Sequence, residues 1–172
     1  MWRETTKRRV GEARRDAVLK FARVLALGTW VGSILYFAAI VTRGAFAVLT
    51  SDQAGALVGV SLAGLHELGV IAAIVYVIAA IGLEMSIKAM AKPAALGVVL
   101  MLLLTLESQR MVIPRMDALR REMTSVEATP PSDPRRAEFD KLHSFSVDLE
   151  AGVFLIGLVA LFLTVGERGE RT

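Results

Sequence analysis

Long apolar blocks are the feature of this sequence that most constrains its fold. The hydrocarbon core of a bilayer is roughly 30 Å thick, so a helix that crosses it needs about 20 apolar residues. Four blocks reach that length, at about residues 21–42, 53–83, 93–113 and 145–165. Because backbone groups in lipid have no water to bond, and no barrel-like alternation is present, these blocks must be helices. The sequence predicts an all-α polytopic membrane protein whose residues 21–166 form a bundle of four transmembrane helices.

Composition narrows the function classes. The chain has 172 residues, of which 54% are hydrophobic and 22% charged. It contains no cysteine, which excludes disulfides, thiolate metal sites and cysteine nucleophiles. It also has no phosphate-binding glycine loop, nucleophile elbow or histidine–glutamate zinc motif. We therefore expect a non-enzymatic protein of a length that suits one domain.

Basic residues orient the predicted bundle, because short loops rich in lysine and arginine stay in the cytoplasm. Eight of the 20 basic residues fall within residues 1–23, whereas the loop after the first block holds only Arg43. We expect both termini, including the tail 167–172, on the cytoplasmic side of a bacterial-type inner or plasma membrane. The loop 114–143 then lies outside, although it also contains basic residues mixed with acidic ones.

The basic N-terminal segment, residues 1–20, allows two interpretations. Apolar residues recur at spacings of three and four, at Val10, Ala13, Ala17 and Phe21. This pattern is typical of an amphipathic helix on the anionic inner leaflet, and equally of a helical extension of the first span. We do not expect a cleaved signal peptide, because the apolar block is too long and starts too far into the chain.

The loop 114–143 is itself expected to contain helix. Met116, Leu119 and Met123 form one stripe, which predicts that the third helix continues or restarts there. Residues 128–134 are rich in proline and polar residues and interrupt that helix. From Arg135 a helix is expected to resume and to lead into the fourth span.

Three glutamates inside the blocks fall at one depth. Counted from the cytoplasmic ends of their helices, Glu67, Glu107 and Glu150 lie 14 to 16 residues into the bilayer. At about 1.5 Å per residue this is roughly 21–24 Å, in the outer third of the membrane. A charge there costs on the order of 2–3 kcal/mol, so such groups normally face the bundle interior and pair. We expect the three carboxylates to converge in one buried polar layer.

Other polar side chains are expected in the same layer. Arg110 lies one turn from Glu107, and His143 shares a helix face with Glu150, seven residues further on. The predicted cluster is Glu67, Glu107, Arg110, His143, Asp148 and Glu150, with His66 and Tyr36 as additional candidates.

Two interpretations of this cluster stay open. It is either a site for a hard metal ion, a cationic substrate or a relayed proton, or an ion-pair network that locks the helices together. Two histidines on different helices also allow haem, although His143 and His66 differ in depth. The sequence therefore assigns no particular metal and no particular cofactor.

Small residues offer faces for close helix packing. The candidate packing positions are Gly28, Trp30, Gly32, Gly55 and Gly59, in which the glycines recur four residues apart. We expect the face with Gly28, Trp30 and Gly32 to contact another helix, within the bundle or in a partner protein.

Three motifs carry a resemblance to a known family. Trp30 is followed by Gly32, Ile113-Pro114-Arg115 closes the third block, and Phe139, His143 and Ser146 open the fourth. These motifs resemble the transmembrane protein 205-like family, whose function is unknown, over about residues 25–163. The resemblance implies four membrane helices and no assigned enzymatic activity. The chain departs from the family at Glu150, where the family tends to have asparagine.

These features lead to two function hypotheses. The first is a structural or accessory subunit that packs through its helices within the membrane or a larger membrane complex. The second is a transporter or an ion- or metal-binding membrane protein that uses the carboxylate–histidine cluster. The expected partners are the lipid bilayer and other membrane-protein subunits. Nucleic acid is not expected, since the basic residues are accounted for by topology.

Overall fold

The described part of the chain consists of helices and turns, with no strand. The computed structural model describes residues 2–167, and the side chains of residues 8–167. Within them, four helical stretches are long and apolar enough to cross a membrane: Arg8–Val48, Ser51–Glu84, Pro93–Met123 and Pro134–Gly166. The predicted fold class is therefore confirmed. The predicted tail lies outside the described residues beyond Glu167.

The first and the third of the four crossing stretches are each built from several helical elements. The first stretch consists of α1 (Trp2–Tyr36), the π-helical η1 (Phe37–Thr42) and α2 (Arg43–Val48). The second stretch is the single helix α3 (Ser51–Glu84), which is followed by the 3-10 turn η2 (Ile87–Ala91). The third joins α4 (Pro93–Glu107), the π-helical η3 (Ser108–Val112) and α5 (Ile113–Met123). The fourth is α6 (Pro134–Gly166).

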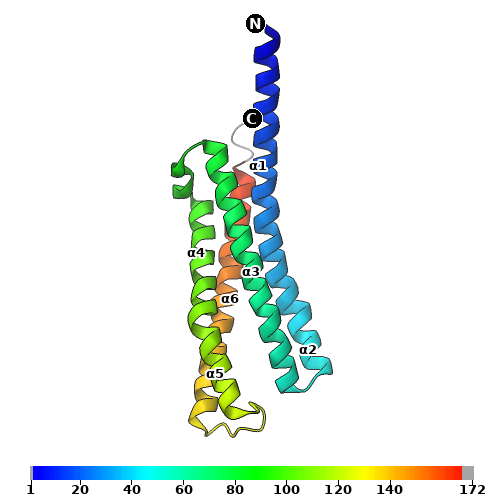
Figure 1. The fold of residues 1–172 in the computed structure, drawn as a ribbon, viewed down its shortest axis with the longest axis vertical. Helices are drawn as coiled ribbons and strands as arrows, with labels where there is room; N and C mark the ends of the chain where they lie inside the picture. Colours follow the sequence, from blue (N-terminus) through cyan, green and yellow to red (C-terminus); the bar gives the residue numbers. More distant parts are fainter. Residues whose placement is uncertain (1, 168–172) are drawn as a thin grey trace.

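The basic N-terminal segment continues the first span. Helix α1 runs without a break from Trp2, and its first turns extend beyond the rest of the bundle (Figure 1). Of the two interpretations of residues 1–20, the structure therefore agrees with the helical extension of the first span.

The loop 114–143 is mostly helix. Only residues 124–133 lie outside α5 and α6. Asp133 caps α6, and its carboxylate accepts hydrogen bonds from the Arg135 side chain and backbone, at 2.6–3.0 Å. These bonds favour the ionised form and lower the pKa of Asp133 to about 2.

The helices form a ring in the order α1, α3, α4, α6. The largest contacts between elements join α1 to α3, α4 to α6, α1 to α6 and α3 to α4. The start of α1, the turn at η2 and the end of α6 lie at one end, which we call the terminal end (Figure 1). The α2–α3 turn and residues 124–133 lie at the other, which we call the loop end.

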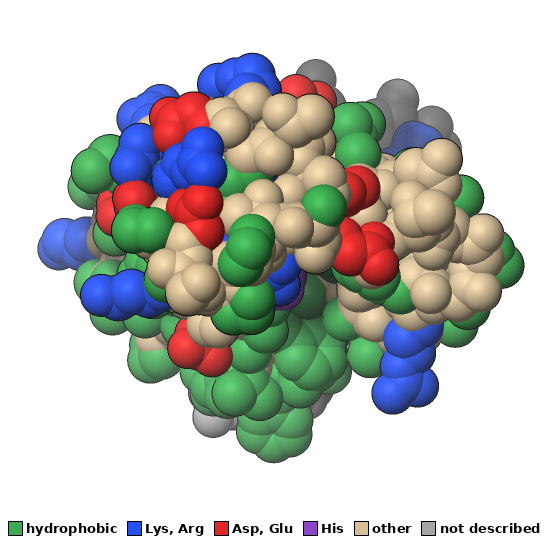
Figure 2. Space-filling view, turned by 90° about the horizontal axis from the view of Figure 1, so that it is seen from below, with side chains coloured by type: hydrophobic (Ala, Val, Ile, Leu, Met, Phe, Trp, Pro, Cys, Tyr) green, Lys and Arg blue, Asp and Glu red, His purple; other side chains and the backbone are tan. Residues whose placement is uncertain are grey.

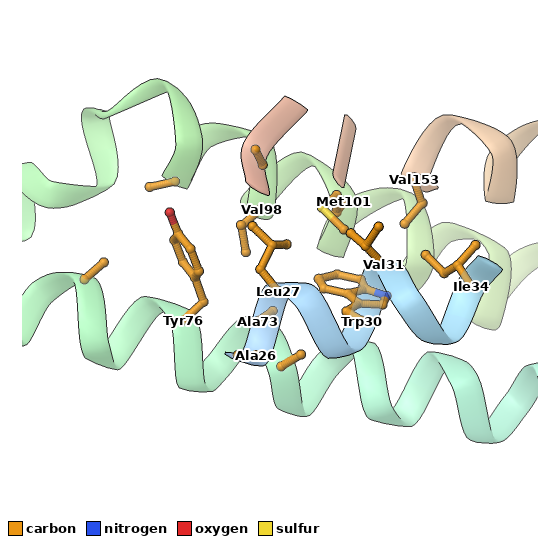
Figure 3. Packing of buried hydrophobic residues seen from close by; sticks show 14 of the residues in the cluster. Ala26, Leu27, Trp30, Val31, Ile34, Ala73, Tyr76, Val98, Met101 and Val153 are labelled. Carbon is orange, nitrogen blue, oxygen red and sulfur yellow. The ribbon is translucent and has the colours of Figure 1, made fainter. Parts of the chain in front are cut away.

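A closed apolar layer fills the middle of the bundle. Trp30, Tyr76 and Met101, from three different helices, have at most 1% of their surface exposed. Figure 3 shows Trp30 of α1 next to α3, in one layer with Val31 and Met101. A Cβ built on Gly69 would lie 2.5 Å from Nε1 of Trp30, so the missing side chain at Gly69 is what lets the indole pack against α3.

The predicted packing glycines do not bring helices together. A Cβ built on Gly28 or Gly32 would meet no atom within 4 Å, so that part of the prediction is wrong for contacts within the bundle. The reason is the orientation of α1, which turns Trp30 inward and leaves Gly32 exposed. Gly55 and Gly59 face the guanidinium of Arg120, not the backbone of another helix.

A polar cluster closes the terminal end. Arg23 is 7% exposed and donates to the Tyr76 hydroxyl at 2.8 Å and to Glu167 at 3.0 Å. Lys92 pairs with Glu84 beside it. The two terminal nitrogens of this buried arginine are bonded to a hydroxyl and a carboxylate, which offsets much of the cost of burying its charge. This cluster and the apolar layer seal the bundle on that side.

Candidate functional site

The four-helix ring opens into a cavity of about 530 Å³ at the loop end. Figure 2 looks at this end and shows a hollow with charged side chains on part of its rim and hydrophobic side chains along the rest. The wall is formed by η1, α2, α3, α5 and α6, and much of it is apolar. Three rings and two aliphatic side chains contribute to that apolar wall: Phe37, Phe46, Phe139, Val58 and Leu62.

A polar triad adjoins the cavity through Glu150, and we call His66, Glu150 and Gln109 the His66 triad. His66 is 2% exposed, and Glu150 lines the cavity. The Nε2 atom of His66 lies 3.2 Å from Oε2 of Glu150, and its Nδ1 atom lies 2.9 Å from Oε1 of Gln109. The three side chains come from α3, α6 and η3, so the triad links three helices.

The triad accommodates His66 in two charge states. With the Gln109 amide as placed, both ring nitrogens face oxygen acceptors, and an imidazolium donates to each. With the amide turned over, a neutral ring donates to Glu150 and accepts from Gln109 at the same positions. The hydrogen bonds that link the three helices therefore do not require one particular tautomer of the ring.

Two π-helical segments supply residues to the cavity wall and to the His66 triad. η3 contributes Gln109 to the triad, and η1 contributes Phe37 and Thr42 to the wall. The Thr42 hydroxyl donates to the Phe37 carbonyl five residues back, at 3.1 Å. Such segments hold an extra residue per turn and re-aim the side chains that follow, and they occur often at functional sites.

The predicted layer of three glutamates does not form. Glu67 and Glu107 are exposed, and no hydrogen bond or ion pair joins either to a residue of the described chain. Depth fixes the height of a side chain, but the helical phase fixes its direction. Adjacent residues point about 100° apart, so His66 faces inward and Glu67 faces outward.

The other predicted members divide in the same way. Arg110, Asp148 and Tyr36 are exposed, and Tyr36 reaches 61%. His143 is exposed but lines the cavity near its mouth. Of the predicted cluster, only Glu150 and the additional candidate His66 are therefore bonded to each other.

The described side chains do not supply a metal centre. Within residues 8–167, no group of three or more histidine, aspartate or glutamate side chains could hold a metal ion. The His66 triad offers one imidazole and one carboxylate, with an amide as the third member. The hydroxyls of Thr105 and Ser108 are buried near this level of the third crossing helix, without a hydrogen-bond partner in the described chain.

Two functional candidates were not predicted from the sequence. Gln109 is the only amide side chain in the third apolar block, and this isolation was a usable signal. Arg120 gave none, because it lies among other charged residues of a predicted loop. Its guanidinium carbon lies 5.6 Å from the centre of the Phe139 ring, on the cavity wall.

The mouth of the cavity is held by a polar clamp. Asp52, in the first turn of α3, accepts hydrogen bonds from the Ser125 hydroxyl at 2.5 Å and from the backbone N–H of Val126 at 3.0 Å. Arg136 of α6 pairs with Asp140 at 2.9 Å and donates to the Val126 carbonyl. Residues 124–127 are therefore tied to α3 on one side and to α6 on the other.

Four apolar crossing helices and a cavity at one end of the ring define a polytopic helical membrane protein. Residues 25–125 match the family described as Domain of unknown function (DUF4149), and the chain belongs to that family. The match ends before α6 and does not tie the chain to the transmembrane protein 205-like family. No curated protein and no solved structure matches the chain.

Proposed function

We propose that this membrane protein binds a small amphipathic molecule in the cavity at the loop end. The observation that carries the proposal is the make-up of the cavity, which places an apolar wall around Phe37 and Leu62 next to the polar group of Glu150. Its volume of about 530 Å³ falls in the range of about 300–1,000 Å³ that small-molecule sites occupy. This develops the hypothesis of a binding or transport protein built on a carboxylate and a histidine.

Binding is favoured over open conduction. Trp30, Tyr76 and Met101 fill the bundle between the cavity and the terminal end, each with 1% exposure or less. A ligand that enters from the loop end would have to displace this layer to cross. Any transport would therefore be coupled to a rearrangement of the bundle.

Ligand binding in the cavity can be tested with a bulky substitution on the face of α3 that lines it. Val58 lines the cavity, whereas Val60 on the same helix is 76% exposed on the outer face. We expect Val58→Trp to reduce ligand capture at least about fivefold by occupying the binding space, and Val60→Trp to leave it unchanged. The probe is a long alkyl chain with a photoreactive diazirine, ending in a carboxylate, an alcohol or an amine, added to protein in phosphatidylcholine vesicles.

The measurement is the yield of probe crosslinked to the cavity-lining peptides, determined by mass spectrometry. Equal capture of all three probes by Val58→Trp and Val60→Trp would show that the chain contacts probes only from the lipid side. That outcome would end the binding proposal.

A second candidate function, an accessory subunit of a membrane complex, is supported by Glu67. This carboxylate lies on an outward stripe of α3 with Val60, Ile71 and Ile74, which are 51–76% exposed. A charge facing lipid costs on the order of 2–3 kcal/mol at mid-membrane. A polar group of a partner protein at this face would offset that cost, and the open face at Gly28 and Gly32 offers further room for one.

The accessory role predicts that Glu67→Gln weakens a specific contact. A photoreactive amino acid placed at Ile71 should crosslink to a discrete membrane protein in cells, and Glu67→Gln should reduce that product. Glu127→Gln, in the exposed loop, is the matched control and should have no effect. If Glu67 faces lipid instead, Glu67→Gln will leave crosslinking unchanged and raise thermal stability in nanodiscs.

We further propose that the protein has no enzymatic activity and that its partners are lipids and other membrane proteins. The proposed orientation places the terminal end in the cytoplasm of a bacterial-type inner membrane, with the cavity opening on the outer side. The basic residues near the N-terminus support this orientation.

A further inference from the structure

We infer that the ligand of this cavity carries an anionic head group with two acceptor oxygens, a carboxylate or a phosphate monoester, bound by Arg120. This inference rests on the proposed function and specifies its ligand. It concerns α5, a part of the wall that the His66 triad does not use.

Packing fixes the position of Arg120. Its side chain is 28% exposed, and its guanidinium lies over the Phe139 ring at 5.6 Å. On the opposite wall α3 passes with Gly55 and Gly59 facing it, where an added Cβ would come within 3.4 and 3.6 Å of the guanidinium nitrogens. An aromatic face and a glycine surface orient a guanidinium without using its N–H groups.

The hydrogen-bonding capacity of Arg120 is unused. A guanidinium has five N–H donors, yet none of those of Arg120 donates a hydrogen bond to another described residue. Arg120 forms an ion pair with Asp117 on the same helix, but at 3.7 Å the two atoms lie beyond hydrogen-bond distance. By contrast, Arg115 on the same helix donates two bonds to Glu138 at 2.7 and 2.8 Å. The guanidinium of Arg120 is therefore already positioned on a partly apolar wall. Such a group binds a carboxylate or a phosphate through two parallel hydrogen bonds.

Unpaired acidic residues around the cavity would instead favour a cationic ligand. Most of the acidic residues here, however, already have partners in the protein. Asp140 is paired with Arg136, Glu150 is bonded to His66, and Asp52 holds the loop through Ser125 and Val126. Asp117 is paired with Arg120 itself at 3.7 Å, and Glu127 lies toward solvent, where its field is screened. Among these charged groups of the wall, Arg120 is the partly sheltered one whose hydrogen-bond donors are unused by the described chain.

The resulting ligand class is an acidic amphiphile. With its head at Arg120, its apolar chain would lie along Phe37, Val58 and Leu62 on the facing wall. Two sources share this chemistry, a free fatty acid and a membrane lipid with a terminal phosphate. The experiment below separates them by including both head groups.

The test uses the full chain in neutral phosphatidylcholine vesicles, with diazirine probes that differ only in the head group. Carboxylate or phosphate probes should crosslink to the cavity peptides about tenfold more than the alcohol, as expected for one charge-assisted two-point contact. Arg120→Gln should lower acidic-probe capture to the level of the alcohol. Arg120→Lys should restore only part of it, because lysine keeps the charge but lacks a planar group that donates two parallel hydrogen bonds. The matched control is Arg121→Gln, which removes the same charge from an exposed position on the same helix.

The outcomes separate this inference from the proposed function. Retained alcohol capture in Arg120→Gln shows that the cavity is intact, so loss of the acidic probes alone supports the inference. Unchanged acidic-probe capture in Arg120→Gln, or a preference for the amine probe, overturns it, while blockage by Val58→Trp would leave the binding proposal standing. If Val58→Trp blocks none of the four probes, the binding proposal itself fails. The stronger of the two acidic probes identifies the source.

Discussion

At the scale of single residues, direction around a helix decides which polar groups become a site. His66 and Glu67 are neighbours in the chain, and only His66 reaches the interior, where it bonds Glu150 and Gln109. The same holds within α6, where Asp148 is exposed and Glu150 lines the cavity. A polar residue at the depth of the site therefore joins it only if its position around the helix axis points its side chain toward the bundle interior.

Residue packing gives a direct test of the core. A Cβ on Gly69 would lie 2.5 Å from Nε1 of Trp30, which is fully buried. We expect Gly69→Ala to destabilise the protein by about 1–3 kcal/mol, because the indole must shift within a packed layer. The control Gly28→Ala meets no atom within 4 Å and should be neutral or stabilising, by up to about 1 kcal/mol. Thermal unfolding in detergent measures both variants, and equal stability of the two would contradict the packing of Trp30.

At the scale of elements, the sequence predicted the crossing helices well. The second apolar block, 53–83, lies within Ser51–Glu84, and the third begins at Pro93 as expected. Local signals account for these starts. Thr50 and Gln53 form a capping box at α3, and proline occupies the first turn of α4. Apolar length and capping are local properties, so no tertiary information was needed.

The π-helical segments were not predictable in the same way. η1 lies inside an apolar run and η3 covers Ser-Gln-Arg-Met-Val, and neither Phe37–Thr42 nor Ser108–Val112 contains a glycine or a proline. An extra residue per turn changes the direction of side chains but not the hydropathy of the span. Because the predicted glutamate layer assumed regular helices and counted only depth, it placed Glu107 in the cluster and left out Gln109.

At the scale of the whole molecule, the structure places the start of α1 and the end of α6 at the same end of the bundle (Figure 1). The orientation of that end in the membrane remains a prediction from the basic N-terminus. The chain contains no cysteine, so single cysteines at Ser132 and Thr172 report separately on the loop end and on the tail. An impermeant thiol reagent applied to intact cells should label only the variant at Ser132.

Permeabilised cells supply the control for that experiment, since both variants should then react. Labelling at Thr172 and not at Ser132 in intact cells would invert the orientation. The cavity mouth would then open to the cytoplasm, and an acidic amphiphile would have to reach it from that side.

The sequence alone determined that this chain is a four-helix membrane protein, because hydropathy adds up along the chain and the bilayer thickness sets the required length. Tertiary structure decided which polar residues meet. It paired His66 with Glu150 and Gln109, turned Glu67 outward, and set Arg120 against Phe139 and the glycines of α3. These outcomes depend on how each helix is rotated against its neighbours and on two local changes of helical pitch. That rotation follows from packing among residues far apart in the sequence, which no single apolar block encodes.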